Sequence, residues 1–460
     1  MRSRSLVRSV IAFCLVMGAP LVDSPAMAQE VEALRREVEQ LRRQLQSLTE
    51  RLQAIEPRRE PTATAPPAAP APAVSQAPSA PGGQPSLTDL ARPRQPFALS
   101  ERRGPGQLLF DIGLSSDFVG NITHRNVEKA RGGTFPGREN RFFPRAIELG
   151  LFGQIDPYAR GEVRIEAAEE FEDGKRSIRV DVAEAHLTLL TVPWGFQVKM
   201  GKMLNRFGLL NQVHEDDLPQ TDRPWVLTRF FGEEGLNENG AEVTWVAPLP
   251  FFLEALVGVF NGDNDAAFGR ASLKAPLLTG RLRTFFELND ENAIQLGVSA
   301  ASGATPDKRQ STLAGVDLKY KLRPDGWPHT LLTLAGEALY SNRRVEVFGD
   351  PDGDGVVTGE RRTRQRFGWY AYGEVRPWKR WALGVRYDWT QFPVSPGHEW
   401  AVGPYLAFMP SEFLRFRLGY KHTDRSERLT GPDDRGSASI ADEILFQATF
   451  RLGAHPAHSF

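Results

Sequence analysis

The feature that most constrains the fold of this chain is a repeated alternation of apolar and polar side chains from about residue 105 onward. In the run 381–389, Trp, Leu, Val, Tyr and Trp occupy the odd positions, whereas Ala, Gly, Arg and Asp occupy the even positions. Successive side chains of a β-strand point to opposite faces, so this pattern predicts a strand with one apolar and one polar face. No long segment of helical periodicity interrupts these runs, which argues against an α/β fold.

About sixteen such runs occur, and short turns such as Asp156-Pro157 and Pro410-Ser411 alternate with longer links between them. Short turns on one side and long loops on the other are typical of outer-membrane barrels, in which the short side faces the periplasm. The pattern therefore predicts an antiparallel transmembrane β-barrel of about 16 strands within residues 98–460. The predicted strands lie near 107–118, 145–155, 158–169, 177–191, 196–207, 236–247, 251–262, 280–288, 293–303, 310–323, 329–346, 361–376, 381–392, 399–409, 412–424 and 441–453.

A soluble β-sandwich is the alternative to a membrane barrel, because its strands alternate in the same way. Two features favour the barrel. The polar faces carry charges of both signs, as a water-filled lumen requires, and aromatic residues stand near the ends of the apolar faces, as in aromatic girdles. A mean hydropathy of −0.36 does not exclude a barrel, because lumen-facing residues keep the average polar. The girdle candidates are Trp245, Tyr320, Trp381, Trp389 and Trp400.

The first 28 residues have the pattern of a secretory signal peptide. A basic start with Arg2, Arg4 and Arg8 precedes an apolar stretch, and Ala26-Met27-Ala28 offers a cleavage site. A membrane anchor is the alternative, but the apolar stretch is shorter than the ~20 residues of a spanning helix. Cleavage after Ala28 would remove the only cysteine, so no disulfide is expected.

Residues 29–56 are predicted to form a periplasmic coiled coil, because apolar residues recur alternately three and four positions apart. Such a narrow apolar stripe implies self-association; a single amphipathic helix docked on the protein is the alternative. Residues 57–97 are rich in Pro and Ala and are predicted to be an extended linker. The coiled-coil positions are Val31, Val38, Leu45 and Leu52 at a, and Leu34, Leu41, Leu48 and Ile55 at d.

This layout resembles the phosphate-selective porin O/P family, whose members combine a signal peptide, a coiled coil, a Pro/Ala-rich link and a sixteen-stranded barrel. The segments 201–208, 222–243 and 257–262 are similar to strand and loop sequences of that family. The resemblance implies a homotrimeric passive channel in the outer membrane. It does not bring phosphate selectivity, because the basic residues that line the family's pore do not align here one by one.

Several basic residues are predicted to line the pore. A ring of Arg and Lys favours anions, because these groups replace part of the hydration shell of a phosphate. Alternatively, opposite charges pair across strands and only keep the wall wet. The link 208–235 is a candidate constriction loop inside the lumen, with a plain extracellular loop as the alternative. The predicted pore-lining residues are Arg376, Arg386, Arg415, Arg417, Lys421, Arg451, Lys319 and Lys321.

The acidic segment 350–360 is a candidate calcium site in an extracellular loop. Asp350, Asp352 and Asp354 alternate, and Gly355 stands at the sixth position, as in the first half of an EF-hand loop. The closing acid, Glu360, falls at the eleventh position rather than the twelfth, so an acidic Gly-rich turn is the alternative. No other cofactor is expected.

The predicted function is that of an outer-membrane porin for passive diffusion of small hydrophilic solutes, including phosphate-like anions. No G-x-S-x-G, H-E-x-x-H or P-loop pattern occurs, so no enzyme is predicted, and a net charge of −1 gives no support for nucleic-acid binding. Expected partners are outer-membrane lipid, further copies of the chain in a homotrimer, and small anions; peptidoglycan is a candidate partner of the coiled coil. The alternative is a non-channel envelope tether that is anchored by its barrel.

Overall fold

A computed structural model describes residues 109–172, 175–326, 329–349, 358–430 and 437–453. The predicted signal peptide, coiled coil and linker lie outside the described residues. No helix in the described ranges has the length and apolar character that a membrane crossing requires. The elements are β1 (Leu109–Thr123), α4 (Arg125–Ala130), β2 (Arg141–Asp156), β3 (Ala159–Glu172), β4 (Lys175–Val192), η1 (Pro193–Gly195), β5 (Phe196–Leu204), η2 (Glu215–Asp217), α5 (Trp225–Phe231), β6 (Asn237–Val246), β7 (Phe252–Phe260), β8 (Leu277–Glu287), β9 (Asn292–Ala304), β10 (Gln310–Leu322), β11 (Leu331–Gly349), β12 (Thr358–Trp378), β13 (Trp381–Gln391), β14 (His398–Ser411), β15 (Leu414–Thr430) and β16 (Ser437–Gly453).

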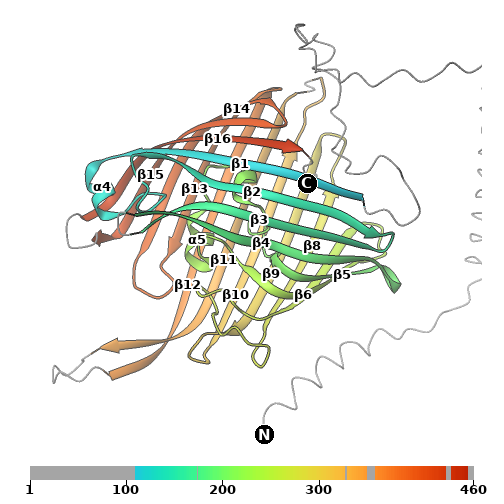
Figure 1. Ribbon diagram of the computed structural model, residues 1–460, viewed down its shortest axis with the longest axis horizontal. Helices are drawn as coiled ribbons and strands as arrows, with labels where there is room; N and C mark the ends of the chain where they lie inside the picture. Colours follow the sequence, from blue (N-terminus) through green and yellow to red (C-terminus); the bar gives the residue numbers. More distant parts are fainter. Residues whose placement is uncertain (1–108, 173–174, 327–328, 350–357, 431–436, 454–460) are drawn as a thin grey trace, which may run out of the picture. The chain divides into compact units, whose positions relative to one another are not determined.

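The sixteen strands form one closed antiparallel barrel (Figure 1). Each strand pairs with its neighbours in the sequence, and β16 closes the cylinder by pairing with β1. The predicted barrel is confirmed, and every predicted run coincides with a strand. Some strands extend further than predicted: β15 continues through 425–430, where side chains on both faces are mostly polar and the alternation no longer marks a strand.

The connections differ in length at the two ends of the barrel. At the end where β1 starts and β16 finishes, the strands are joined by short turns, for example 157–158 between β2 and β3 and 379–380 between β12 and β13. The opposite end holds the longest links, 124–140 and 205–236, and α4 lies in the first of them. We call these the short-turn end and the long-loop end.

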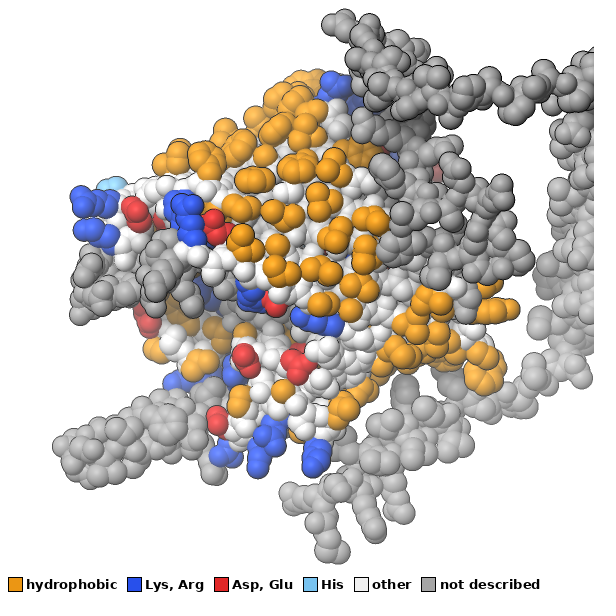
Figure 2. Space-filling view, in the orientation of Figure 1, with side chains coloured by type: hydrophobic (Ala, Val, Ile, Leu, Met, Phe, Trp, Pro, Cys, Tyr) orange, Lys and Arg blue, Asp and Glu red, His pale blue; other side chains and the backbone are white. Residues whose placement is uncertain are grey.

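The outer surface of the barrel is largely apolar, as Figure 2 shows for one face. On β7, for example, the outward Val257 is 62% exposed, whereas the inward Glu254 is buried. Aromatic side chains also stack along the outer face, including Trp381 on Phe408 and Tyr387 on Trp400. An outward apolar surface and an inward polar wall are what a barrel in a lipid bilayer requires.

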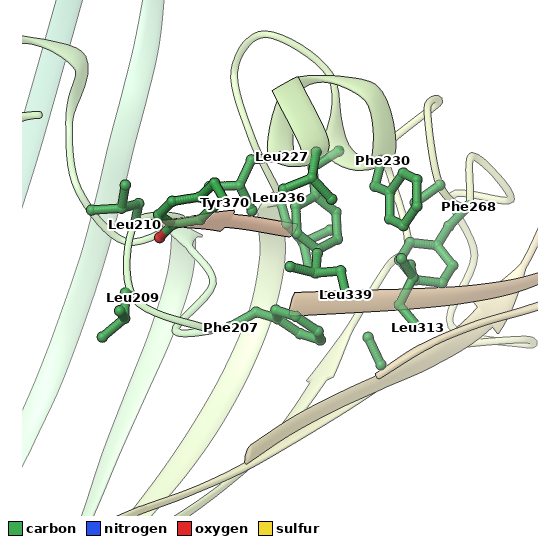
Figure 3. Close-up of a cluster of buried hydrophobic side chains, with 14 of the residues drawn as sticks. Phe207, Leu209, Leu210, Leu227, Phe230, Leu236, Phe268, Leu313, Leu339 and Tyr370 are labelled. Carbon is green, nitrogen blue, oxygen red and sulfur yellow. The ribbon is translucent and has the colours of Figure 1, made fainter. Parts of the chain in front are cut away.

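The largest buried apolar cluster lies inside the barrel. It forms where residues 205–236, here called the constriction loop, fold back into the lumen and pack against the inner wall of β7 to β12. Figure 3 shows side chains of this cluster from the loop and from the wall. Of the two alternatives for this link, the structure therefore shows the loop inside the lumen. The cluster includes Phe207, Leu209, Leu210, Leu227, Phe230, Leu236, Phe268, Leu313, Leu339 and Tyr370.

Candidate functional site

The constriction loop enters the lumen through a glycine that no other residue replaces easily. Gly208 has φ of +62°, and a Cβ at this position would overlap the carboxylate of Glu337 on β11. Glu337 also accepts hydrogen bonds from the Leu209 N–H at 3.3 Å and from the Tyr370 hydroxyl at 2.9 Å. The start of the loop is therefore fixed against the wall by both backbone conformation and hydrogen bonds.

The short helix α5 contributes four side chains of the loop to the buried cluster: Val226, Leu227, Phe230 and Phe231. Pro224 precedes the helix, and Gly232, at φ of +84°, follows its last residue; a positive φ of this kind favours glycine. Phe231 packs edge-on against Phe207 with ring centroids 5.3 Å apart. Because Phe231 is only 1% exposed, α5 behaves as a core element within the lumen.

The other side of the loop is held by ion pairs. Asp222 lies 2.9 Å from the Arg386 guanidinium of β13 and 2.5 Å from the Lys421 ammonium of β15. Burial opposes the charge of Asp222, but these two cations more than offset that effect and lower its pKa to about 2. One loop carboxylate thus joins two strands of the wall.

The acidic turn η2 is bound to β1, β2, β15 and β16. Asp217 forms an ion pair with Arg451, and the Arg415 guanidinium donates to the Asp216 carbonyl. Arg417 donates to the Leu218 carbonyl at 3.0 Å. Arg145 of β2 lies 2.6 Å from Asp117 and 3.4 Å from Glu215, so it also links this part of the wall to the loop.

Five of the predicted pore-lining residues therefore contact the constriction loop: Arg386, Arg415, Arg417, Lys421 and Arg451. The other three, Lys319, Lys321 and Arg376, lie on the inner face nearer the short-turn end, where Arg376 donates to Glu374 at 2.9 Å. In the predicted calcium segment, Asp350, Asp352 and Asp354 lie outside the described residues, and Glu360 is described only as part of β12.

Sequence reasoning missed two wall residues that hold the loop, Arg145 and Glu399, and also Asp117, which pairs with Arg145. Glu399 of β14 binds the loop residue Arg229 and also Arg425 of β15 at 2.9 Å. Asp117 and Glu399 occupy ordinary inward positions, so the alternation places them in the lumen but does not show what they contact. Arg145 lies at a register shift of β2, where strict alternation from Glu148 would place it on the outer face.

A cavity of about 500 Å³ lies on the long-loop side of the constriction loop. Its wall carries both signs of charge together with Trp225, whose ring lies under Arg229, Lys421 and Arg425 at 4.0–5.4 Å. A solute in this cavity would thus meet charges of both signs and the aromatic rings of Trp225 and Phe135. Charged residues that line the cavity include Arg145, Glu166, Arg223, Arg229, Glu233 and Arg425.

No family model matches the chain. It is similar to an uncharacterized protein of Aquifex aeolicus (strain VF5), with 29% identity over 346 residues that cover 68% of this chain and 69% of the relative. Similar solved structures include an anion-selective porin from Comamonas acidovorans and the outer membrane channel DcaP of Acinetobacter baumannii. Each is 10% identical and covers 75% of this chain, with 99% and 97% of the respective structure covered and a TM-score of 0.46 in both cases. Membership of the phosphate-selective porin O/P family stays a prediction.

Proposed function

We propose that this chain is an outer-membrane porin that lets small hydrophilic solutes diffuse through a lumen narrowed by the constriction loop. The observation that carries the proposal is a closed barrel with an apolar outside and a charged inside, in which a loop is held from both sides of the lumen. The outside suits lipid, and the fixed charges inside suit water and polar solutes. The homotrimer and the periplasmic coiled coil remain expectations.

The finer part of the proposal is a preference for phosphate-like anions. Three cations of β13 to β16 give it little support, because loop carboxylates pair with them: Asp222 with Arg386 and Lys421, and Asp217 with Arg451. Three other basic residues on the inner wall support it, since the charges of Lys319, Lys321 and Arg376 act on one another; Glu374 also acts on Lys319. A cluster with excess positive charge favours anions.

The channel itself is tested by reconstituting the purified, untagged protein into planar lipid bilayers. Stepwise increases in conductance are the expected result. The protein must first be shown to be folded, for which the heat-dependent shift of barrels in gel electrophoresis is sufficient. Folded protein that leaves the bilayer silent at high concentration would contradict the proposal and favour the envelope tether.

The anion preference is tested by the reversal potential in a salt gradient. The Arg376 side chain is 44% exposed, so its charge reaches the water of the lumen. We expect Arg376→Glu to shift the reversal potential toward cation selectivity, and Lys274→Glu, an exposed change in the link between β7 and β8, to shift it less. A cation-selective wild-type channel would contradict the anion preference while leaving the porin proposal intact.

A further inference from the structure

The inner wall of the barrel brings together three side chains with metal-binding atoms: Glu162 of β3, and Glu184 and His186 of β4. Glu162 is paired directly opposite His186 across the two strands, and Glu184 precedes His186 by two positions on the same face. The strand geometry therefore places all three on one small area of the wall. One ligand atom from each lies within 4.8 Å of the other two.

Each carboxylate has one oxygen held by a neighbour and the other directed toward the imidazole. Glu162 Oε1 accepts from Arg164 Nε at 2.7 Å, and its Oε2 lies 3.9 Å from His186 Nε2. Glu184 Oε1 accepts from the Leu204 N–H at 3.0 Å, and its Oε2 lies 3.1 Å from the same nitrogen. Hydrogen bonds of this kind orient the ligands of metal sites before the ion arrives.

The imidazole of His186 is buried and incompletely bonded. Its side chain is 5% exposed, and its Nδ1 has no hydrogen-bond partner among the described residues. The two carboxylates face the other ring nitrogen, Nε2, so this nitrogen is the one that a cation between them would meet. A cation at Nε2 would replace the 3.1 Å hydrogen bond between this nitrogen and Glu184 Oε2, and the same oxygen would then bind the cation.

We propose that Glu162, Glu184 and His186 form a binding site for a divalent transition-metal cation of the Zn²⁺ type. Zinc binds nitrogen and carboxylate oxygen at about 2.0–2.2 Å, which sets tetrahedral ligand atoms about 3.3 Å apart. His186 Nε2 lies 3.1 Å from Glu184 Oε2 and 3.9 Å from Glu162 Oε2, so these two distances bracket the tetrahedral value. One imidazole with two carboxylates suits a borderline cation better than Ca²⁺ or Mg²⁺, which take oxygen ligands, and it leaves a fourth position for water.

The surrounding charges are compatible with a bound cation. Arg164 is the nearest buried base, and it is shared between Glu162 and a third carboxylate, Glu148, at 2.6 Å. Arg160 lies 3.7 Å from Glu162 and is 48% exposed, so water screens its charge. The constriction loop reaches the same area, where His214 Nε2 lies 3.6 Å from Glu184 Oε1. A metal ion would therefore lie directly beside the contact that the loop makes with β4.

The test is an equilibrium titration of folded, untagged protein in detergent with Zn²⁺, in the presence of excess Ca²⁺ to occupy oxygen-rich sites. We expect saturable binding of one Zn²⁺ per chain. His186→Gln and Glu184→Gln should each weaken that binding at least tenfold, because each removes one of three ligands. His422→Gln, which alters an imidazole paired with Asp442 rather than with this cluster, should leave the affinity unchanged, as should the double variant His455→Gln and His458→Gln.

Substituting Co²⁺ gives a second readout that does not depend on affinity alone. The visible absorption spectrum of bound Co²⁺ should indicate mixed nitrogen and oxygen ligands. This spectrum should be absent in His186→Gln. Absence of saturable Zn²⁺ binding, or affinity retained in both His186→Gln and Glu184→Gln, would overturn the proposal; Glu162→Gln replaces either variant that does not fold. The result is separate from the porin proposal, since a barrel that is silent in bilayers could still bind the ion.

Discussion

Asp222 is buried in the lumen between Arg386 and Lys421, and its charge depends on both cations. Removing one partner of a buried ion pair leaves an uncompensated charge, which costs more than the pair contributes when intact. Removing the Asp222 carboxylate would leave two buried cations, Arg386 of β13 and Lys421 of β15, without this partner. The residue is therefore a sensitive point in the attachment of the constriction loop.

We expect Asp222→Asn to destabilise the folded protein by about 3–5 kcal/mol, the usual cost of breaking a buried pair. Urea unfolding in detergent, followed by tryptophan fluorescence, measures it. Asp181→Asn serves as the matched control, because Asp181 pairs with Arg179 in an exposed position and such pairs contribute about 0–1 kcal/mol. Equal effects of the two substitutions would show that Asp222 does not anchor the loop.

Asp222 also makes the loop sensitive to acid. Its pKa is lowered from 3.8 to about 2, so the folded state holds the carboxylate charged where an unfolded chain would not. The stabilisation is therefore fully present above about pH 4 and is lost as the pH falls from about 4 toward 2. We expect proteolytic cleavage within 205–236 to become faster over this interval, and Asp222→Asn to be cleaved fast throughout, with a smaller rise as the pH falls because Asp216 still titrates. A wild-type cleavage rate that is flat across the interval would contradict the assignment.

At the scale of the element, the constriction loop combines an apolar face and an acidic face. The apolar side chains of α5 belong to the buried cluster inside the barrel, and α5 lies against β12 and β13. The acidic turn η2 contacts Arg415 and Arg451 near the β1–β16 closure. The sequence alone indicates that such a loop exists, from its length and its mixed charges. Its position in the lumen depends on contacts with residues far along the chain, for example Glu399, and no local pattern encodes those.

Phe231→Ala tests the apolar side of the loop. Because Phe231 is buried against Phe207, we expect a loss of about 3–5 kcal/mol in stability and a larger single-channel conductance as the loop loosens. Leu273→Ala removes a 67% exposed side chain in the link between β7 and β8 and should change neither quantity. Unaltered conductance in a destabilised Phe231→Ala barrel would indicate that the loop does not limit the pore.

For the strands, by contrast, period-two alternation was sufficient. Each strand has lipid on one face and the lumen on the other. Successive side chains therefore alternate between an apolar and a polar environment, and the local sequence shows this alternation. The prediction failed only where that environment ends, as in 425–430 of β15. The predicted pore-lining set shows the same limit: the alternation places Arg417 inside the barrel but cannot indicate that it binds the Leu218 carbonyl.

At the scale of the whole molecule, the apolar outer surface fixes where the barrel can reside. We expect Val257→Arg, an outward change near the middle of β7, to cost about 2–4 kcal/mol of folding free energy in lipid vesicles, as charges do on the lipid face. Asp290→Arg in the exposed turn between β8 and β9 should cost about 0–1 kcal/mol. Folding titrations in urea measure both, and equal costs would mean that Val257 does not face lipid.

The closure of β1 on β16 has a consequence for how the molecule must be made. Asp117 accepts hydrogen bonds from Gln447 at 2.8 Å and Thr449 at 2.7 Å, across more than 300 residues of intervening chain. The β1–β16 pairing can form only after β16 has been translated and exported. Until then the sheet has two unpaired edge strands, which can pair with other chains. Newly synthesised copies therefore need chaperoning until their last seventeen-residue strand arrives to seal the wall.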